Sequence, residues 1–160
     1  MKHTSIMVAL LAAGCASTVP VPDNLKPGAK ESLNLVVPAK GVQIYECRAG
    51  TWLFVAPEAE LFDRTGKKIG SHYAGPHWES ADGSKIVGAV KQRADAPDAG
   101  NIPWLLLGTK SVGSEGAFSK VTSIQRVATV GGIAPAAGCN EAGARARVPY
   151  TADYYLFSPK

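Results

Sequence analysis

Short apolar stretches separated by turn sequences follow one another through most of the chain. Residues 42–47 alternate in side-chain character, and the run 51–55 is dense in β-branched and aromatic residues. Both features are typical of strands, and together the two segments predict a hairpin. A turn sequence at 64–67 then leads into a third extended stretch at 68–73.

Asp82-Gly83 is the strongest turn signal in the sequence, because both residues accept positive φ. The segments on either side, 77–80 and 85–90, therefore predict a second hairpin. The run 102–107 is continuously apolar, which indicates a strand buried on both faces.

The C-terminal part adds two predicted strands. Residues 118–130 have apolar positions at helical spacing, but their many β-branched residues favour a strand. Residues 150–157 are rich in aromatic side chains, and we expect them to close the domain as a strand. Between these segments, residues 142–147 are small and basic and predict a loop or a single helical turn.

The composition agrees with short strands joined by tight turns. The 160 residues include 17 glycines and 11 prolines, and 46% of the side chains are hydrophobic. That content is enough for one packed core at this length. The sequence therefore predicts an all-β fold, a single antiparallel β-sandwich or barrel-like domain with irregular loops.

Residues 1–14 have the organisation of a signal peptide. A weakly positive start precedes an apolar run at 6–13, whereas a membrane-spanning helix needs about 20 apolar residues. Residues 10–15 resemble the lipobox of bacterial lipoproteins, which implies cleavage before Cys15 and a lipid on its thiol. The alternative is ordinary secretion, in which Cys15 is either removed with the signal peptide or kept without a lipid.

Residues 15–29 carry three prolines and no apolar periodicity. We expect a Pro-rich tether here, a few tens of Å long at about 3 Å per residue, followed by a single β-rich domain over 30–160. Two or more acyl chains anchor a protein stably. By resemblance to sorted lipoproteins, Ala16 after the lipidated cysteine implies the outer membrane of a bacterial cell envelope, facing the periplasm.

Cys47 and Cys139 remain as an even pair once Cys15 is assigned to lipid. In an oxidising compartment a disulfide is the economical interpretation, and two free buried thiols are the alternative. The formal charge is only +4, and no run of Lys and Arg is interleaved with aromatic residues. We therefore expect a membrane as partner through the lipid, and no nucleic acid.

Several motifs form a specific combination that covers nearly the whole chain after residue 40. They lie at 72–76, 78–79, 82–84, 102–107, 121–135, 138–139 and 149–155. In combination they resemble an uncharacterised family of secreted bacterial and fungal proteins known as a domain of unknown function, DUF3455. The resemblance implies no activity. A dehydrogenase label on some fungal relatives has no counterpart here, since no Gly-x-Gly-x-x-Gly fingerprint follows a predicted strand.

His72, His77 and Glu79 form the only cluster with suitable metal-ligand chemistry. His77 and Glu79 share a strand face, and the break at Gly75-Pro76 can turn the two imidazoles toward each other. Two histidines and a carboxylate suit zinc or copper, and no other cofactor is expected. The alternative is that His72 or Glu79 satisfies backbone groups around an irregular turn, with His77 exposed.

The same segment offers candidates for catalysis. His72 would act as general base, and Glu79 or Asp82 would orient it. Ser71 or Ser84 would supply the nucleophile, although the sequence has no Gly-x-Ser-x-Gly elbow.

Aromatic residues indicate a third function, because they can stack on sugars or other envelope ligands. In a small β domain such rings more often fill the core; the candidates are Trp52, Trp78, Trp104, Tyr150, Tyr154 and Tyr155. We expect any ligand to bind at His72, Trp78 and Glu79, on irregular backbone beside rigid strands.

The predicted function is an extracytoplasmic, lipid-anchored binding or accessory module of the cell envelope, whose partner is an envelope polysaccharide or a small ligand. The alternative is a small hydrolase-like enzyme or a metal-binding protein centred on His72, His77 and Glu79.

Lipidation is directly testable by replacing Cys15 with alanine. We expect wild-type protein to partition into the detergent phase and Cys15→Ala to partition into the aqueous phase, because only a thiol can take the lipid. Phase partition of the two proteins expressed in a bacterium measures this. Identical partition into the aqueous phase would show that no lipid is attached.

Overall fold

The computed structural model describes residues 19–160, so the predicted signal peptide and Cys15 lie outside the described residues. A short 3-10 helix precedes eight strands. The elements are η1 (Asp23–Leu25), β1 (Glu31–Arg48), β2 (Thr51–Phe62), β3 (Lys68–Tyr73), β4 (His77–Ser80), β5 (Lys85–Ala94), β6 (Trp104–Ser111), β7 (Ser123–Gly131) and β8 (Arg145–Pro159). The predicted all-β fold is confirmed. Within the described residues, no helix combines the length and the apolar character that crossing a membrane requires.

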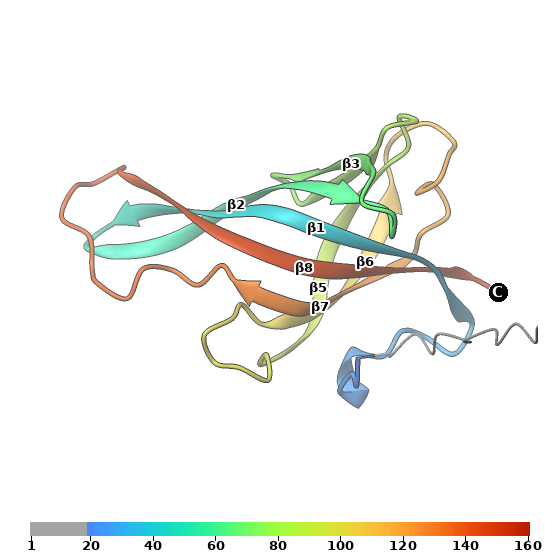
Figure 1. The fold of residues 1–160 in the computed structure, drawn as a ribbon, viewed down its shortest axis with the longest axis horizontal. Coiled ribbons are helices and arrows are strands. Elements are labelled where there is room, and N and C mark those ends of the chain that lie inside the picture. Colours follow the sequence, from blue (N-terminus) through green and yellow to red (C-terminus); the bar gives the residue numbers. More distant parts are fainter. Residues whose placement is uncertain (1–18) are drawn as a thin grey trace, which may run out of the picture.

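Each strand pairs antiparallel with the next one along the chain, and β1 also pairs with β8. The eight strands therefore form one closed sheet, described topologically as a closed barrel. Of the two predicted architectures, the barrel-like one is found and the two-sheet sandwich is not. Strands β1, β2 and β8 extend together well past the others (Figure 1).

Pairing between β1 and β8 makes both strands longer than the sequence predicted. Their register runs from Glu31 opposite Pro159 to Glu46 opposite Arg145, whereas the clear strand pattern begins at residue 42. The prediction of a loop or helical turn at 142–147 is therefore wrong from Arg145 onward. These strand ends form because the partner strand satisfies their backbone N–H and C=O groups. The local sequence pattern does not reveal that partner.

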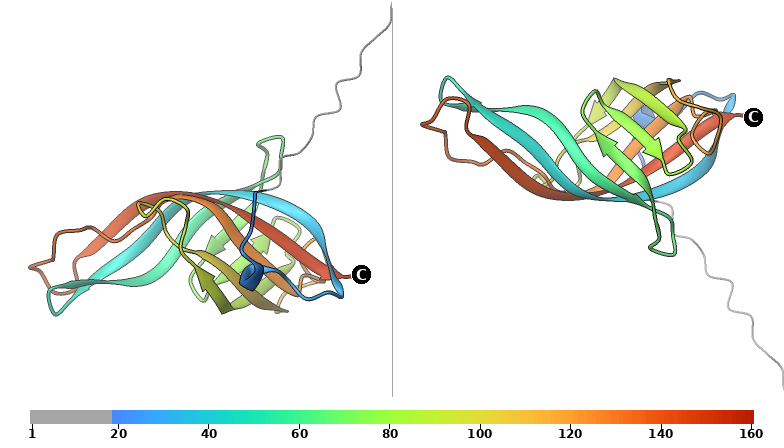
Figure 2. Two further views of the ribbon diagram at one scale, coloured as in Figure 1. Left: turned by 90° about the horizontal axis from the view of Figure 1, so that it is seen from below. Right: turned by 90° about the horizontal axis from the view of Figure 1, so that it is seen from above.

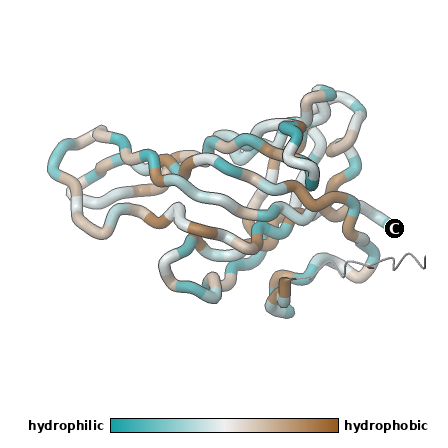
Figure 3. The backbone as a smooth tube through the Cα atoms, viewed as in Figure 1, coloured by the Kyte–Doolittle hydropathy of each residue, from teal (hydrophilic) through white to brown (hydrophobic). Residues whose placement is uncertain are grey.

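The two ends of the closed sheet differ. We call the open end the one formed by the turns at 49–50 and 74–76 and the loops 95–103 and 132–144. The opposite, plugged end carries the turns at 63–67 and 81–84 and the loop 112–122. Hydrophilic residues mark most of these connections, whereas hydrophobic residues lie along the strands and at η1 (Figure 3).

The loop 112–122 turns inward and fills the plugged end. Phe118 is completely buried and packs in the interior core with Val121. Ser84 Oγ accepts a hydrogen bond from the Phe118 N–H, and Asp82 Oδ2 accepts one from the Ala117 N–H. The β4–β5 turn therefore holds the plug in place. The predicted strand at 118–130 is confirmed only from residue 123, because the first part of that segment forms this plug.

The N-terminal segment covers part of the outer face of the sheet (Figure 2). Leu25 is fully buried in a second cluster with Trp104, Leu106 and Val127, and Val19 packs against that cluster. Leu105 and Leu107 of the same strand face the interior core instead. The prediction that this strand is buried on both faces is confirmed. The described part of the predicted tether, residues 19–29, lies in contact with the domain.

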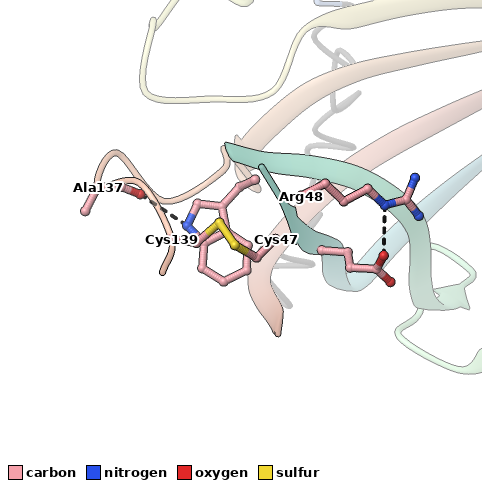
Figure 4. Close-up of a disulfide and its surroundings, with 6 residues drawn as sticks. Cys47, Arg48, Ala137 and Cys139 are labelled. Carbon is pink, nitrogen blue, oxygen red and sulfur yellow. Dashed lines mark hydrogen bonds and ion pairs between the residues drawn. A yellow bond between two sulfur atoms is a disulfide. The ribbon is translucent and has the colours of Figure 1, made fainter. Parts of the chain in front are cut away.

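A disulfide joins Cys47 at the end of β1 to Cys139 in the loop 132–144, across 92 positions of sequence. Trp52 Nε1 donates a hydrogen bond to the Ala137 carbonyl beside it (Figure 4). The predicted disulfide is confirmed. Its presence fits a domain that is exported to an oxidising compartment.

Removing this disulfide should lower the free energy of unfolding by about 2 to 5 kcal/mol, because the cross-link restricts the unfolded chain. We expect that loss in the double variant Cys47→Ser/Cys139→Ser, measured by denaturant titration. Wild-type protein unfolded in reductant is the matched control and should lose a similar amount. Equal stability of oxidised wild type and the double variant would contradict the prediction.

Candidate functional site

A cavity of about 340 Å³ lies inside the closed sheet at its open end. This volume is at the small end of the range of ligand sites. Most of the wall is apolar, and four lining residues carry polar side-chain groups: Gln43, His72, Trp78 and Arg126. A small number of polar groups in an apolar wall is the composition typical of a ligand-binding site.

His72 and Trp78 form one wall, from neighbouring strands β3 and β4 in which they are directly paired. Their rings stack, with centroids 4.1 Å apart. The turn between these strands requires Gly75, whose φ is 117°. Gly88 of β5 leaves room for the indole, since a Cβ there would lie 2.8 Å from Trp78 Cζ3.

The imidazole of His72 is neutral. Its Nδ1 lies 2.7 Å from the His77 carbonyl oxygen. A carbonyl oxygen can only accept, so Nδ1 carries the proton and Nε2 keeps its lone pair. Burial lowers the pKa of His72 from 6.5 to about 3, although the hydrogen bond to the His77 backbone acts in the opposite direction.

Arg126 of β7 places a positive charge at the opposite wall. Its Nε and Nη2 both donate to the Pro103 carbonyl, at 3.2 and 2.8 Å. Within residues 19–160, no carboxylate forms an ion pair with it. Burial raises the pKa of the neighbouring Tyr150 and Tyr154 against the effect of the Arg126 charge. Their hydroxyls therefore stay neutral and do not balance that charge.

Two buried donors at the cavity have no hydrogen-bond partner in the described structure: Gln43 Nε2 and Trp78 Nε1. Both side chains are almost completely buried. A buried donor without a partner costs about 1 to 3 kcal/mol, and native proteins contain few of them. Both nitrogen atoms are enclosed by the protein and have almost no accessible surface, so a ligand in the cavity reaches neither donor directly.

The mouth of the cavity is apolar and exposed. Phe54 and Val55 of β2 line one side, with 54% and 38% of their surface accessible, and Val90 of β5 lines the other with 58% accessible. Exposed apolar side chains gathered at a cavity mouth indicate an interaction site.

The structure separates the residues that the sequence analysis grouped. His72 and Trp78 face inward, whereas His77 and Glu79 project from the other face of the sheet. There His77 stacks on Tyr73. Glu79 accepts a hydrogen bond of 2.5 Å from the Tyr73 hydroxyl and lies 3.5 Å from Lys85 Nζ. His72, His77 and Glu79 therefore do not converge, and the described residues contain no group of three potential metal ligands.

Asp82 and Ser84 lie at the plugged end, away from the cavity. Asp82 Oδ1 accepts hydrogen bonds from the Ser84 hydroxyl and N–H, at 2.6 and 2.9 Å. These bonds, the hydroxyl first, and the Ala117 N–H hold the pKa of Asp82 well below its usual range. Ser71 is paired opposite Glu79 in β3 and does not line the cavity. The residues considered for catalysis are therefore not assembled around His72.

Sequence reasoning missed Gln43 and Arg126. One signal was available for Arg126. It lies two positions after Ile124, and residues two positions apart point to the same face of a strand. Ile124 is a core residue, so this spacing places the charge of Arg126 on the interior face. Nothing comparable marks Gln43, because a polar residue in an alternating strand ordinarily faces solvent.

Comparison with known proteins gives one match. The model of a family described as "Protein of unknown function (DUF3455)" matches residues 27–158. Curated proteins and solved structures give no match.

The buried His72 should make stability depend on pH. Below pH 6.5 the unfolded chain binds a proton that the folded chain, with a pKa of about 3, does not bind. Stability is therefore complete above pH 6.5 and falls as the pH is lowered, with a slope approaching about 1.4 kcal/mol per pH unit.

Denaturant titrations between pH 7 and 5 test this, because most carboxyl groups titrate at lower pH. We expect His72→Gln to lose most of the slope, and His77→Gln, which replaces the histidine on the other face of the sheet, to retain it. Equal slopes in the two variants would contradict the assignment of the pH dependence to His72.

Proposed function

We propose that this chain, which belongs to the family described as Protein of unknown function (DUF3455), is a binding module that holds a small ligand in the cavity at the open end of its sheet. One observation carries the proposal: a cavity inside the closed sheet opens between the exposed apolar side chains of Phe54, Val55 and Val90. An apolar cavity with exposed apolar side chains at its mouth is typical of a ligand-binding site.

The chemistry of the wall favours binding over catalysis. Among residues 19–160, His72 and Arg126 are the only titratable residues that line the cavity, and no carboxylate, hydroxyl or thiol side chain of that part of the chain lines it. A hydrolase needs a nucleophile or a second acid–base group within reach of the substrate. The hydrolase-like and metal-binding alternatives therefore receive no support from the geometry of the described residues.

The size of the cavity favours a small molecule over a polysaccharide. A volume of about 340 Å³ enclosed by strands accommodates a compact ligand, whereas a polymer needs an open groove along the surface.

We further infer that the domain is exported and held close to a membrane. If Cys15 carries the lipid, Val19, which packs on the sheet, lies only four positions further along the chain. Fully extended, four residues span about 14 Å, less than the few tens of Å expected from the whole Pro-rich segment. An anchored domain would thus meet ligands at the bilayer surface of the cell envelope.

Binding is testable with N-phenyl-1-naphthylamine, a neutral apolar dye whose fluorescence rises away from water. We expect saturable 1:1 binding to the folded domain. Val90→Trp should weaken it by about tenfold or more, since a larger side chain at the mouth obstructs entry. Fluorescence titration measures both.

Val130→Trp is the matched control, because Val130 is an equally exposed strand valine, 60% accessible, that does not line the cavity. It should bind the dye like wild type. Absence of saturable binding to wild type, or equal loss in both variants, would overturn the proposed function.

A further inference from the structure

The cavity contains a positive charge that the protein does not neutralise. We propose that its ligand is a small amphipathic monocarboxylate, with its carboxylate paired to Arg126 and its apolar part directed to the mouth. This inference rests on the proposed binding function and specifies the ligand class.

The guanidinium of Arg126 is only partly hydrogen-bonded. Nε and Nη2 share one acceptor, the Pro103 carbonyl, and the neutral Tyr154 hydroxyl also interacts with the guanidinium. Neither acceptor carries a charge. A guanidinium matches carboxylate oxygens in a planar, charge-assisted pair. The Arg126 side chain is only partly buried, so an anionic ligand would take the place of water at the guanidinium and pair with its charge.

The charge of Arg126 determines which head groups fit the cavity. A carboxylate is an acceptor with about four lone-pair sites, enough to accept hydrogen bonds from the guanidinium at both oxygens. A cationic ligand would face the Arg126 charge, and the described wall contains no carboxylate to balance it.

The charge balance favours a monoanion over a phosphate dianion. His72 is neutral, because burial lowers its pKa to about 3. Arg126 is thus the one positive charge that the described part of the chain places in the wall of the cavity. A single carboxylate neutralises it, whereas a dianion would leave a net negative charge among apolar side chains.

The position of the Arg126 charge also determines where the apolar part of the ligand would lie. Arg126 pairs with Leu105 and with the buried Tyr154 in the sheet, while exposed Phe54 and Val90 stand at the mouth. A head group at Arg126 directs the rest of the molecule along the apolar wall toward the exposed side chains. This arrangement requires a ligand that is charged at one end and apolar at the other.

Calorimetric titration with octanoate and its neutral isostere octanamide tests the inference. We expect wild type to bind octanoate about tenfold or more tightly than octanamide, because the amide lacks the charge. Arg126→Gln should remove that preference, so that the variant binds octanoate and octanamide with similar affinity. Arg145→Gln is the control, since Arg145 is exposed and does not line the cavity, and it should bind like wild type.

Arg126→Lys keeps the charge without the planar fork and should retain part of the preference, so that a folding defect in Arg126→Gln does not remove the test. Equal affinity of wild type for octanoate and octanamide would overturn the carboxylate inference and leave the binding function standing. Tighter binding of octyl phosphate than of octanoate would also overturn it, in favour of a phosphate head group. Failure of both octyl ligands and of the neutral dye would overturn the binding function itself.

Discussion

Backbone pairing between the first and last strands, from Glu31 opposite Pro159 to Glu46 opposite Arg145, converts a linear series of hairpins into a closed sheet. All the other pairings join strands that are consecutive in sequence. Without the β1–β8 ladder the sheet would expose two long edges, which are prone to pair with other chains. Closure removes those edges and creates an interior, so both the core and the cavity depend on this one contact.

The interior is used differently at its two ends. At the plugged end Phe118 fills the space, and Asp82 and Ser84 hold the loop that carries it. At the open end the interior keeps a cavity, with the Arg126 charge at its wall. This contrast between a filled end and an open one is the basis of the proposed binding function.

The separation of His72 from His77 and Glu79 shows that residues close in sequence need not meet when they lie on strands of one hairpin. The β3–β4 hairpin keeps its strand alternation on both sides of Gly75, so that Tyr73 pairs with His77 and His72 with Trp78. His72 becomes part of the interior, while Glu79 forms surface contacts. The prediction of a ligand site at His72 and Trp78 named residues that line the cavity, but the third residue, Glu79, faces away from it.

Local pattern in the sequence determined the all-β class, most of the strands, the turn at Asp82-Gly83 and the candidate disulfide, because strand alternation, turn chemistry and cysteine pairing are short-range or compositional signals. Tertiary structure decided where β1 and β8 end, since each is extended by a partner about a hundred or more positions away. It also decided that Arg126 and Gln43 face a cavity. Alternation predicts that residues share a face, but only closure of the sheet determines which face becomes the interior.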